Sequence, residues 1–155
     1  MICMKQPNSK HCFVCGRENP YGLKLEFYEI APGEVFVEYI VPEQFQGYPG
    51  VVHGGVVAAM LDEVIGRVHM GGDPPRFMFT ARLDVRYRKN VPIGEPLRIV
   101  GHAGKSKERT AIATGQIFGP DGDLLAEAEA MLVNVPDGIA DQVDLEALGW
   151  KVYPD

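Results

Sequence analysis

One long apolar segment constrains this chain more than any other feature. Residues 56–68 read VVAAMLDEVIGRV and follow a His53-Gly54-Gly55 turn. Paired glycines suit a tight turn, and a helix that begins there has free backbone N–H groups at its positive end. Negative charge, including charge that develops on a carbonyl oxygen, is favoured at that end. We expect one buried helix whose first turn either polarises a ligand or is simply a tight turn.

Asp62 is the residue of this helix that most needs an explanation. On a projection at about 100° per residue it falls on a narrow face of small residues, between Ala58 and Gly66. Asp62 and Glu63 either keep a surface strip soluble, or Asp62 has room beside it for a substrate or a partner chain. Because the other sides of the helix are so apolar, we favour the second interpretation for Asp62. Glu63 points about 100° away, and we expect it to be a solvated charge.

The composition indicates one globular domain over residues 1–155. The chain is 46% hydrophobic and 23% charged, and its length suffices for one core. A net charge of −6 argues against general binding to nucleic acid or to an acidic membrane, since both need cationic patches. The apolar runs are too short for a membrane span, and the first residues lack a secretory pattern. We therefore expect a cytoplasmic protein.

Cys3, Cys12 and Cys15 do not form a disulfide framework, because their number is odd. Cys12 and Cys15 have the two-residue gap of a zinc knuckle, and His11 lies beside them. Structural zinc sites take four ligands, however, and no second cysteine pair follows in the sequence. We predict no metal site and expect both thiols to pack as small apolar groups, since completion by a distant residue would depend on the fold.

Strand-like patterns lie on both sides of the helix. Apolar and polar residues alternate at 23–30 and 35–41 around a turn, which indicates a hairpin. Four further runs predict strands at 77–89, 95–102, 111–118 and 124–135, although the last is rich in alanine and also compatible with a helix. About six antiparallel strands wrapped around one central helix give a two-layer α+β domain. The side of the helix that the sheet leaves open predicts pairing with a second copy of the chain.

These motifs resemble the PaaI-like acyl-CoA thioesterases, a family with the hotdog fold. The resemblance lies in the His53-Gly54-Gly55 turn with an acid nine residues after the histidine, in residues 12–23 and in residues 45–52. It spans roughly residues 12–135 and is similar to the branch with the mammalian mitochondrial thioesterase superfamily members. The resemblance implies a homodimer or homotetramer that hydrolyses an acyl-CoA to a free acid and coenzyme A and needs no cofactor.

The resemblance also implies roles for the residues around the helix. The Gly55 N–H, with Gly54 beside it, would be the oxyanion donor. Asp62 would supply the attack, either as general base to a water or as nucleophile. His53 would position the carbonyl or the start of the helix. In such enzymes the site is built across the dimer, so Asp62 and Gly55 of one site would come from different chains.

Two more residues gain a role from the resemblance. Thr80 matches the position of a hydroxyl that orients the acid or its water, and Gln46 is a candidate amide near the thioester carbonyl. The alternation of residues 77–89 places Phe79, Leu83 and Tyr87 on one face of a strand. Thr80 would then be the first residue of a polar row on the opposite face.

Coenzyme A carries several phosphate charges, so an acidic protein that binds it needs a local cluster of Lys and Arg side chains. One cluster lies on strand 77–89 and includes Arg88 and Lys89, whereas we expect Arg82 and Arg86 to be an exposed sheet face. The other cluster lies at an expected hairpin tip and consists of Lys105, Lys107 and Arg109.

Two alternative functions stay open at this point. A non-catalytic acyl-CoA-binding or regulatory module would keep the pocket but lose the acid, so Asp62 argues against it. An enoyl-CoA hydratase or dehydratase needs a histidine and an acid arranged for proton transfer beside the carbonyl. The sequence does not define the preferred acyl group.

Overall fold

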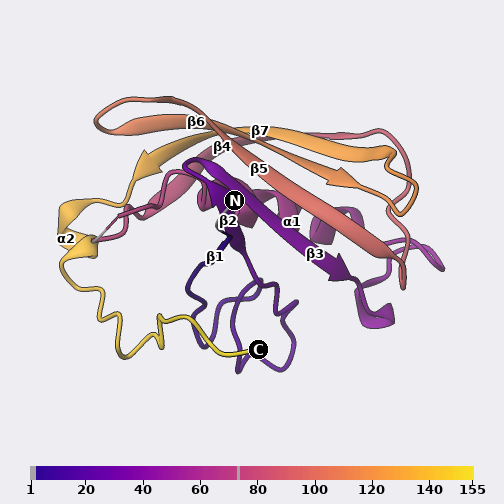
Figure 1. Cartoon of the computed structure of the whole chain (residues 1–155), viewed down its shortest axis with the longest axis horizontal. Coiled ribbons are helices and arrows are strands. Elements are labelled where there is room, and N and C mark those ends of the chain that lie inside the picture. Colours follow the sequence, from indigo (N-terminus) through magenta and orange to yellow (C-terminus); the bar gives the residue numbers. More distant parts are fainter. Residues whose placement is uncertain (1–2, 73) are drawn as a thin grey trace.

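The computed structural model describes residues 3–72 and 74–155, and its strands arch over one long helix (Figure 1). The sheet is antiparallel, with seven strands in the order β1-β2-β3-β5-β6-β7-β4. The strands are β1 (Met4–Lys5), β2 (Tyr28–Ala31), β3 (Glu34–Ile40), β4 (Met78–Tyr87), β5 (Pro96–Ser106), β6 (Thr110–Phe118) and β7 (Leu124–Asn134). The helices are α1 (Gly54–Gly66), the short 3-10 helix η1 (Glu43–Phe45) and α2 (Asp137–Ala140). The two-layer α+β architecture predicted from the sequence is confirmed.

Helix α1 lies close to the sheet because two glycines face it. A Cβ atom on Gly101 of β5 would lie 2.9 Å from the carbonyl oxygen of Val64, and one on Gly115 of β6 would lie 3.1 Å from Ile65. This approach buries Leu61 and Ile65 completely, which contributes about 1.5–3 kcal/mol for each side chain. Neither α1 nor any other helix in the described ranges combines the length and apolarity that a bilayer crossing requires.

The alanine-rich last run forms strand β7 and not a helix. Ala126, Ala128 and Ala130 are buried, while Glu129 between them is exposed. This period of two is the pattern of a strand with one covered face. Small side chains on the covered face leave room for α1, so packing against the helix decides against the helix propensity of alanine.

The first expected strand is shorter than its sequence pattern. Residues 23–27 alternate as predicted and bury Leu23, Leu25 and Phe27, but β2 begins only at Tyr28. The backbone N–H groups of Leu23 and Leu25 donate instead to the carbonyl oxygens of Phe13 and Val14. The cysteine-containing loop therefore takes the place of a strand neighbour and is attached to the core.

The two edges of the sheet differ. β1, at one edge, has two residues, whereas β4, at the other, has ten. Beside this long edge, Phe79 and Tyr87 of β4 and Met131 of β7 are exposed large hydrophobic residues. A long edge strand with apolar residues is a surface that proteins normally cover.

Candidate active site

Asp62 and Thr80 form the central contact of the candidate site. Asp62 lies two turns along α1, and Thr80 lies near the start of β4. The Thr80 hydroxyl donates a hydrogen bond of 2.6 Å to Oδ1 of Asp62. A hydrogen bond to a carboxylate is short and strong, and it fixes the direction of the second carboxylate oxygen. The contact agrees with the role that the resemblance implied for Thr80, a hydroxyl that orients the acid or its water.

A β-bulge brings Thr80 to the helix side of the sheet. Along β4, Thr80 pairs with Leu132, but Arg82 pairs with Met131, so Ala81 is an extra residue. Leu132 is fully buried beneath the sheet, and Thr80 shares its face. The predicted polar row is therefore wrong for Thr80, because a bulge changes the alternation at that point. Beyond the bulge, Arg82 lies on the outer face.

Asp62 and Thr80 line a cavity of about 490 Å³ that is mainly apolar. Its apolar lining comes from the segment between α1 and β4, from the start of β4 and from the C-terminal segment, and includes Met70, Phe77, Met78, Ile139 and Trp150. Phe77 packs edge to face on Trp150, with ring centroids 5.4 Å apart. The cavity therefore combines the Asp62 carboxylate, and the Glu63–Arg67 pair on its wall, with the apolar surroundings that a hydrocarbon chain or ring prefers.

The other candidate residues lie at the start of α1. His53 is the N-cap, and its Nδ1 accepts a hydrogen bond of 2.9 Å from the Gly55 N–H. This cap occupies the donor that the resemblance assigned to the oxyanion. Gly54 is the first helical residue, and among the described residues its N–H donates to no backbone carbonyl group. The structure thus favours Gly54 over Gly55 as the free donor.

Tyr87 is a residue at this end that the sequence analysis missed. Its hydroxyl donates to the carbonyl oxygen of Gly54 at 2.7 Å, from the last residue of β4. Tyr87 and Gly54 line a second cavity, of about 580 Å³, together with His53 and Tyr48. The only signal in the sequence was the apolar row of β4, which gave no reason to expect a polar contact.

The two halves of the site lie apart within one chain. Gly55 and Asp62 are seven residues apart on α1, which corresponds to about 10 Å along the helix axis. The two parts of the helix also border different cavities: Asp62 lines the cavity of about 490 Å³, whereas His53 and Gly54 line the cavity of about 580 Å³. One carbonyl group therefore cannot contact both the start of α1 and Asp62 of the same chain.

Gln46 lies in the loop before α1. Its Oε1 accepts a long hydrogen bond of 3.4 Å from the Gly50 N–H, and its backbone forms an isolated bridge with Val52. The preceding residue, Phe45, accepts a hydrogen bond from the His53 N–H. Gln46 is therefore near the helix start, but its side chain is exposed and lines neither cavity.

The two cationic clusters lie in different places. Arg88 and Lys89 line the cavity at the helix start, where they form ion pairs with Glu127 and Asp123. Arg82 and Arg86 are exposed on the outer face of the sheet, as expected. The second cluster lies at the exposed β5–β6 tip, borders neither cavity, and consists of Lys105, Lys107 and Arg109.

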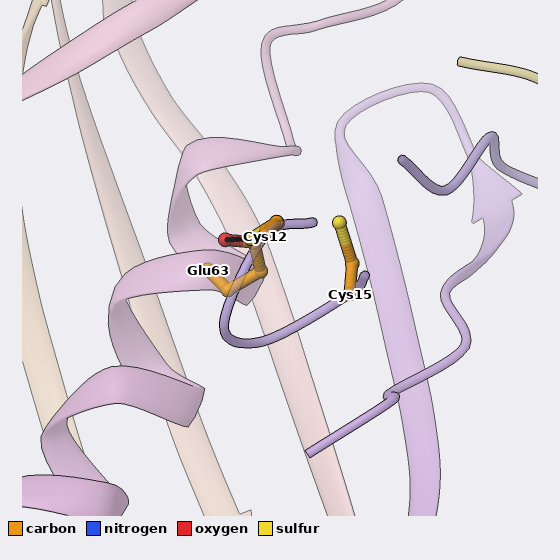
Figure 2. Close-up of side chains that lie close together, drawn as sticks. All are labelled: Cys12, Cys15 and Glu63. Atoms are coloured by element: carbon orange, nitrogen blue, oxygen red, sulfur yellow. Dashed lines mark hydrogen bonds between the residues drawn. The ribbon is translucent and has the colours of Figure 1, made fainter. Parts of the chain in front are cut away.

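Glu63 is not the solvated charge that the sequence analysis predicted. Only 23% of its side chain is exposed, and its Oε1 lies 3.2 Å from Nε of the buried Arg67. Burial raises the pKa of Glu63, although the Arg67 charge opposes the shift. The cause lies far away in the sequence: the loop with Cys12 and Cys15 covers this face of α1 (Figure 2).

The comparisons with known proteins agree with this geometry. The family described as thioesterase superfamily matches residues 49–126, half of the chain. Acyl-coenzyme A thioesterase THEM4 of Xenopus laevis is 31% identical over 93 residues, which are 58% of this chain. The chain spans 40% of the length of that relative.

Solved structures confirm the hotdog architecture. A thioesterase superfamily protein with 31% identity superposes with a TM-score of 0.73, over 80% of this chain and 63% of that chain. Zebrafish thioesterase superfamily member 2 has 24% identity and a TM-score of 0.67, over 77% and 89%. A Streptococcus mutans protein bound to acetyl CoA has 20% identity and a TM-score of 0.65, over 72% and 88%.

Proposed function

Because this chain belongs to the thioesterase superfamily, we propose that it hydrolyses acyl-CoA thioesters to a carboxylic acid and free CoA. The observation that carries the proposal is the Asp62 carboxylate, which Thr80 orients beside an apolar cavity. The substrate class is supported by the curated relative, which is an acyl-coenzyme A thioesterase, and by the S. mutans relative, which binds acetyl CoA.

Asp62 starts the reaction in one of two ways. As general base it takes a proton from water, and the water oxygen attacks the thioester carbonyl carbon. The C–S bond then breaks, and the CoA sulfur takes up the proton. As nucleophile, a carboxylate oxygen attacks the same carbon, the C–S bond breaks, and CoA leaves as a thiolate. Water then hydrolyses the mixed anhydride to the acid and the Asp62 carboxylate, and the proton that is released is taken up by the CoA thiolate. In both routes Thr80 occupies Oδ1, while the described residues place no donor on Oδ2.

The thioester carbonyl oxygen binds at the start of α1, in our proposal. The helix dipole and the Gly54 N–H favour the negative charge that develops there during attack. Since Asp62 of the same chain is eight residues from Gly54, about 12 Å away along the axis, the attacking carboxylate comes from a second copy. A homodimer whose sites combine Gly54 of one chain with Asp62 of the other satisfies both requirements.

The β4 edge supports this self-association. Its ten residues have unpaired backbone groups on one side, and exposed Phe79 and Tyr87 lie on the same strand. Pairing of two β4 edges would bury these groups and extend the sheet through the dimer. We also propose that two dimers assemble into a tetramer, which a measurement of molecular size tests. A cytoplasmic location is a further proposal, which cell fractionation tests.

In our proposal, the two cavities bind different parts of the acyl-CoA substrate. The apolar cavity beside Asp62 suits the acyl group, and the cavity at the helix start suits CoA. Arg88 and Lys89 line the latter, so they are better placed for CoA phosphates than the cluster at the β5–β6 tip.

Thiol release from a panel of short, medium, long and aryl acyl-CoAs tests the function. Wild type is expected to release CoA from at least one of them, and Asp62→Asn to lose nearly all of this activity at unchanged stability. If wild type binds acyl-CoA without releasing thiol, the chain is a binding module. Turnover of an enoyl-CoA without thiol release would identify a hydratase, and full activity of Asp62→Asn would refute the role of Asp62.

A mixing experiment tests the composite site. Gly54→Pro removes the N–H at the first helical position, where proline is well tolerated. Gly54→Pro and Asp62→Asn are each expected to be inactive. Random re-assembly of the two gives half heterodimers with one intact site each, so about one quarter of wild-type activity returns. A mixture that stays inactive would contradict a site shared between chains.

A further inference from the structure

Cys12, Cys15 and Glu63 bring three metal-ligating atoms together from two distant parts of the chain. The two thiol sulfurs and one carboxylate oxygen all lie within 4.8 Å of one another. Figure 2 shows both cysteines on one loop, with Glu63 facing Cys12 from α1. The Cys12 sulfur lies 4.0 Å from Oε2 of Glu63. Sulfur and oxygen ligands of one tetrahedral zinc ion are about 3.5 Å apart, so a small closing movement suffices.

The loop that carries the sulfurs is held in one conformation. The Gly16 N–H donates to the Cys12 carbonyl oxygen at 2.8 Å, and the Val14 N–H lies 3.4 Å from the Cys12 sulfur. A Cβ atom at Gly16 would lie 2.4 Å from the Cys12 carbonyl oxygen, so this tight turn requires glycine. The Ser9 hydroxyl lies 3.5 Å from the Cys15 sulfur. A backbone N–H thus donates to the Cys12 sulfur, and the Ser9 hydroxyl is within reach to donate to a Cys15 thiolate.

The charges of the cluster leave a place for a divalent cation. Glu63 uses Oε1 for its ion pair with Arg67, and Oε2 is the oxygen that faces the cysteines. Arg67 and Glu63 neutralise each other. Two deprotonated thiols would therefore leave two negative charges in a largely buried place, which one divalent cation balances.

We propose that Cys12, Cys15 and Glu63 bind one divalent cation of the zinc class. Two thiolates with one carboxylate are a donor set that suits Zn²⁺ better than Mg²⁺ or Ca²⁺, which prefer oxygen ligands. The fourth position opens to the cavity that Asp62 and Thr80 line, because the three ligands border the same cavity. The ion connects the N-terminal loop to α1 at Glu63, which is adjacent to Asp62 in the sequence. This site is independent of the proposed hydrolysis and replaces the expectation of no metal.

Metal titration of the full chain tests the site. The protein is stripped with a chelator under reducing conditions, and Zn²⁺ is returned in competition with a chromophoric chelator. Wild type is expected to bind one ion per chain. Cys12→Ser and Cys15→Ser weaken binding by at least about 100-fold, and Glu63→Gln by about 10- to 100-fold. Cys3→Ser, which changes an exposed cysteine outside the cluster, is the matched control and keeps wild-type affinity.

Cobalt provides a second readout that does not depend on the folding of any variant. Co²⁺ bound to wild type is expected to show an intense thiolate-to-metal charge-transfer band, which Zn²⁺ displaces. Absence of this band, absence of Zn²⁺ uptake by the reduced protein, or an equal loss in Cys3→Ser would each overturn the proposal. So would the formation of a Cys12–Cys15 disulfide in a chain that takes up no metal when reduced.

Discussion

Thr80→Val is the most direct perturbation of the candidate active site. Valine keeps the shape of threonine but removes the hydroxyl that donates to Asp62 at 2.6 Å. A hydrogen bond to a charged group contributes about 1.5–3 kcal/mol, and the lower value applies because Thr80 is exposed in the single chain. If the bond orients the attacking carboxylate in the transition state, kcat falls about 10-fold.

The assay is steady-state thiol release with the best acyl-CoA of the panel. Thr80→Ser retains a hydroxyl at the same place and is expected to stay within about 3-fold of wild type. Deletion of Ala81 removes the bulge and turns Thr80 to the outer face, so it should reduce kcat at least as much as Thr80→Val. Full activity of Thr80→Val, or an equal loss in Thr80→Ser, would refute the positioning role.

Three further predictions concern the substrate, the core and the pH dependence. Lys89→Ala should raise KM for acyl-CoA several-fold, but not KM for an acyl-pantetheine, which lacks the nucleotide phosphates. Lys107→Ala at the exposed tip should change neither KM. Equal effects of the two substitutions on KM for acyl-CoA would contradict the placement of CoA. Gly101→Ala should cost about 1–3 kcal/mol in a denaturant titration because its Cβ meets α1, while Gly66→Ala, where nothing lies within 4 Å, should not destabilise. Burial raises the pKa of Tyr39 to about 12, so the folded state holds a proton that the unfolded state loses near pH 10. Stability should therefore fall as pH rises from about 10 to 12, and Tyr39→Phe should lack this part of the fall in Tm.

The fold was largely predictable because its signals are local and periodic. The apolar face of α1 and the β-branched and aromatic runs of the later strands depend on neighbouring residues, and the helix and these strands appear in the structure as predicted. Asp62 was also recognisable, since a carboxylate on a small-residue face of an apolar helix is unusual. The resemblance then supplied Thr80 as its partner.

The misplaced residues depend on contacts that no local pattern contains. The bulge at Ala81 inserts one residue into β4, and a period of two cannot reveal where it is interrupted. Glu63 looked solvated because the loop that covers it lies about 50 positions earlier in the sequence. The Tyr87 contact with Gly54 likewise joins residues 33 positions apart. In each case tertiary packing decided the environment of the side chain.

The cap at the start of α1 also determines the protonation pattern of the His53 ring. A neutral imidazole that accepts the Gly55 N–H at Nδ1 carries its own proton on Nε2. His53 is thereby fixed as the Nε2–H tautomer, with one nitrogen occupied by the backbone and the other a donor. At this end of the site it can give a hydrogen bond to a bound carbonyl group, but it cannot take a proton from water while the cap is intact. Nitrogen chemical shifts of the ring, measured with and without a bound CoA ester, would report this tautomer directly.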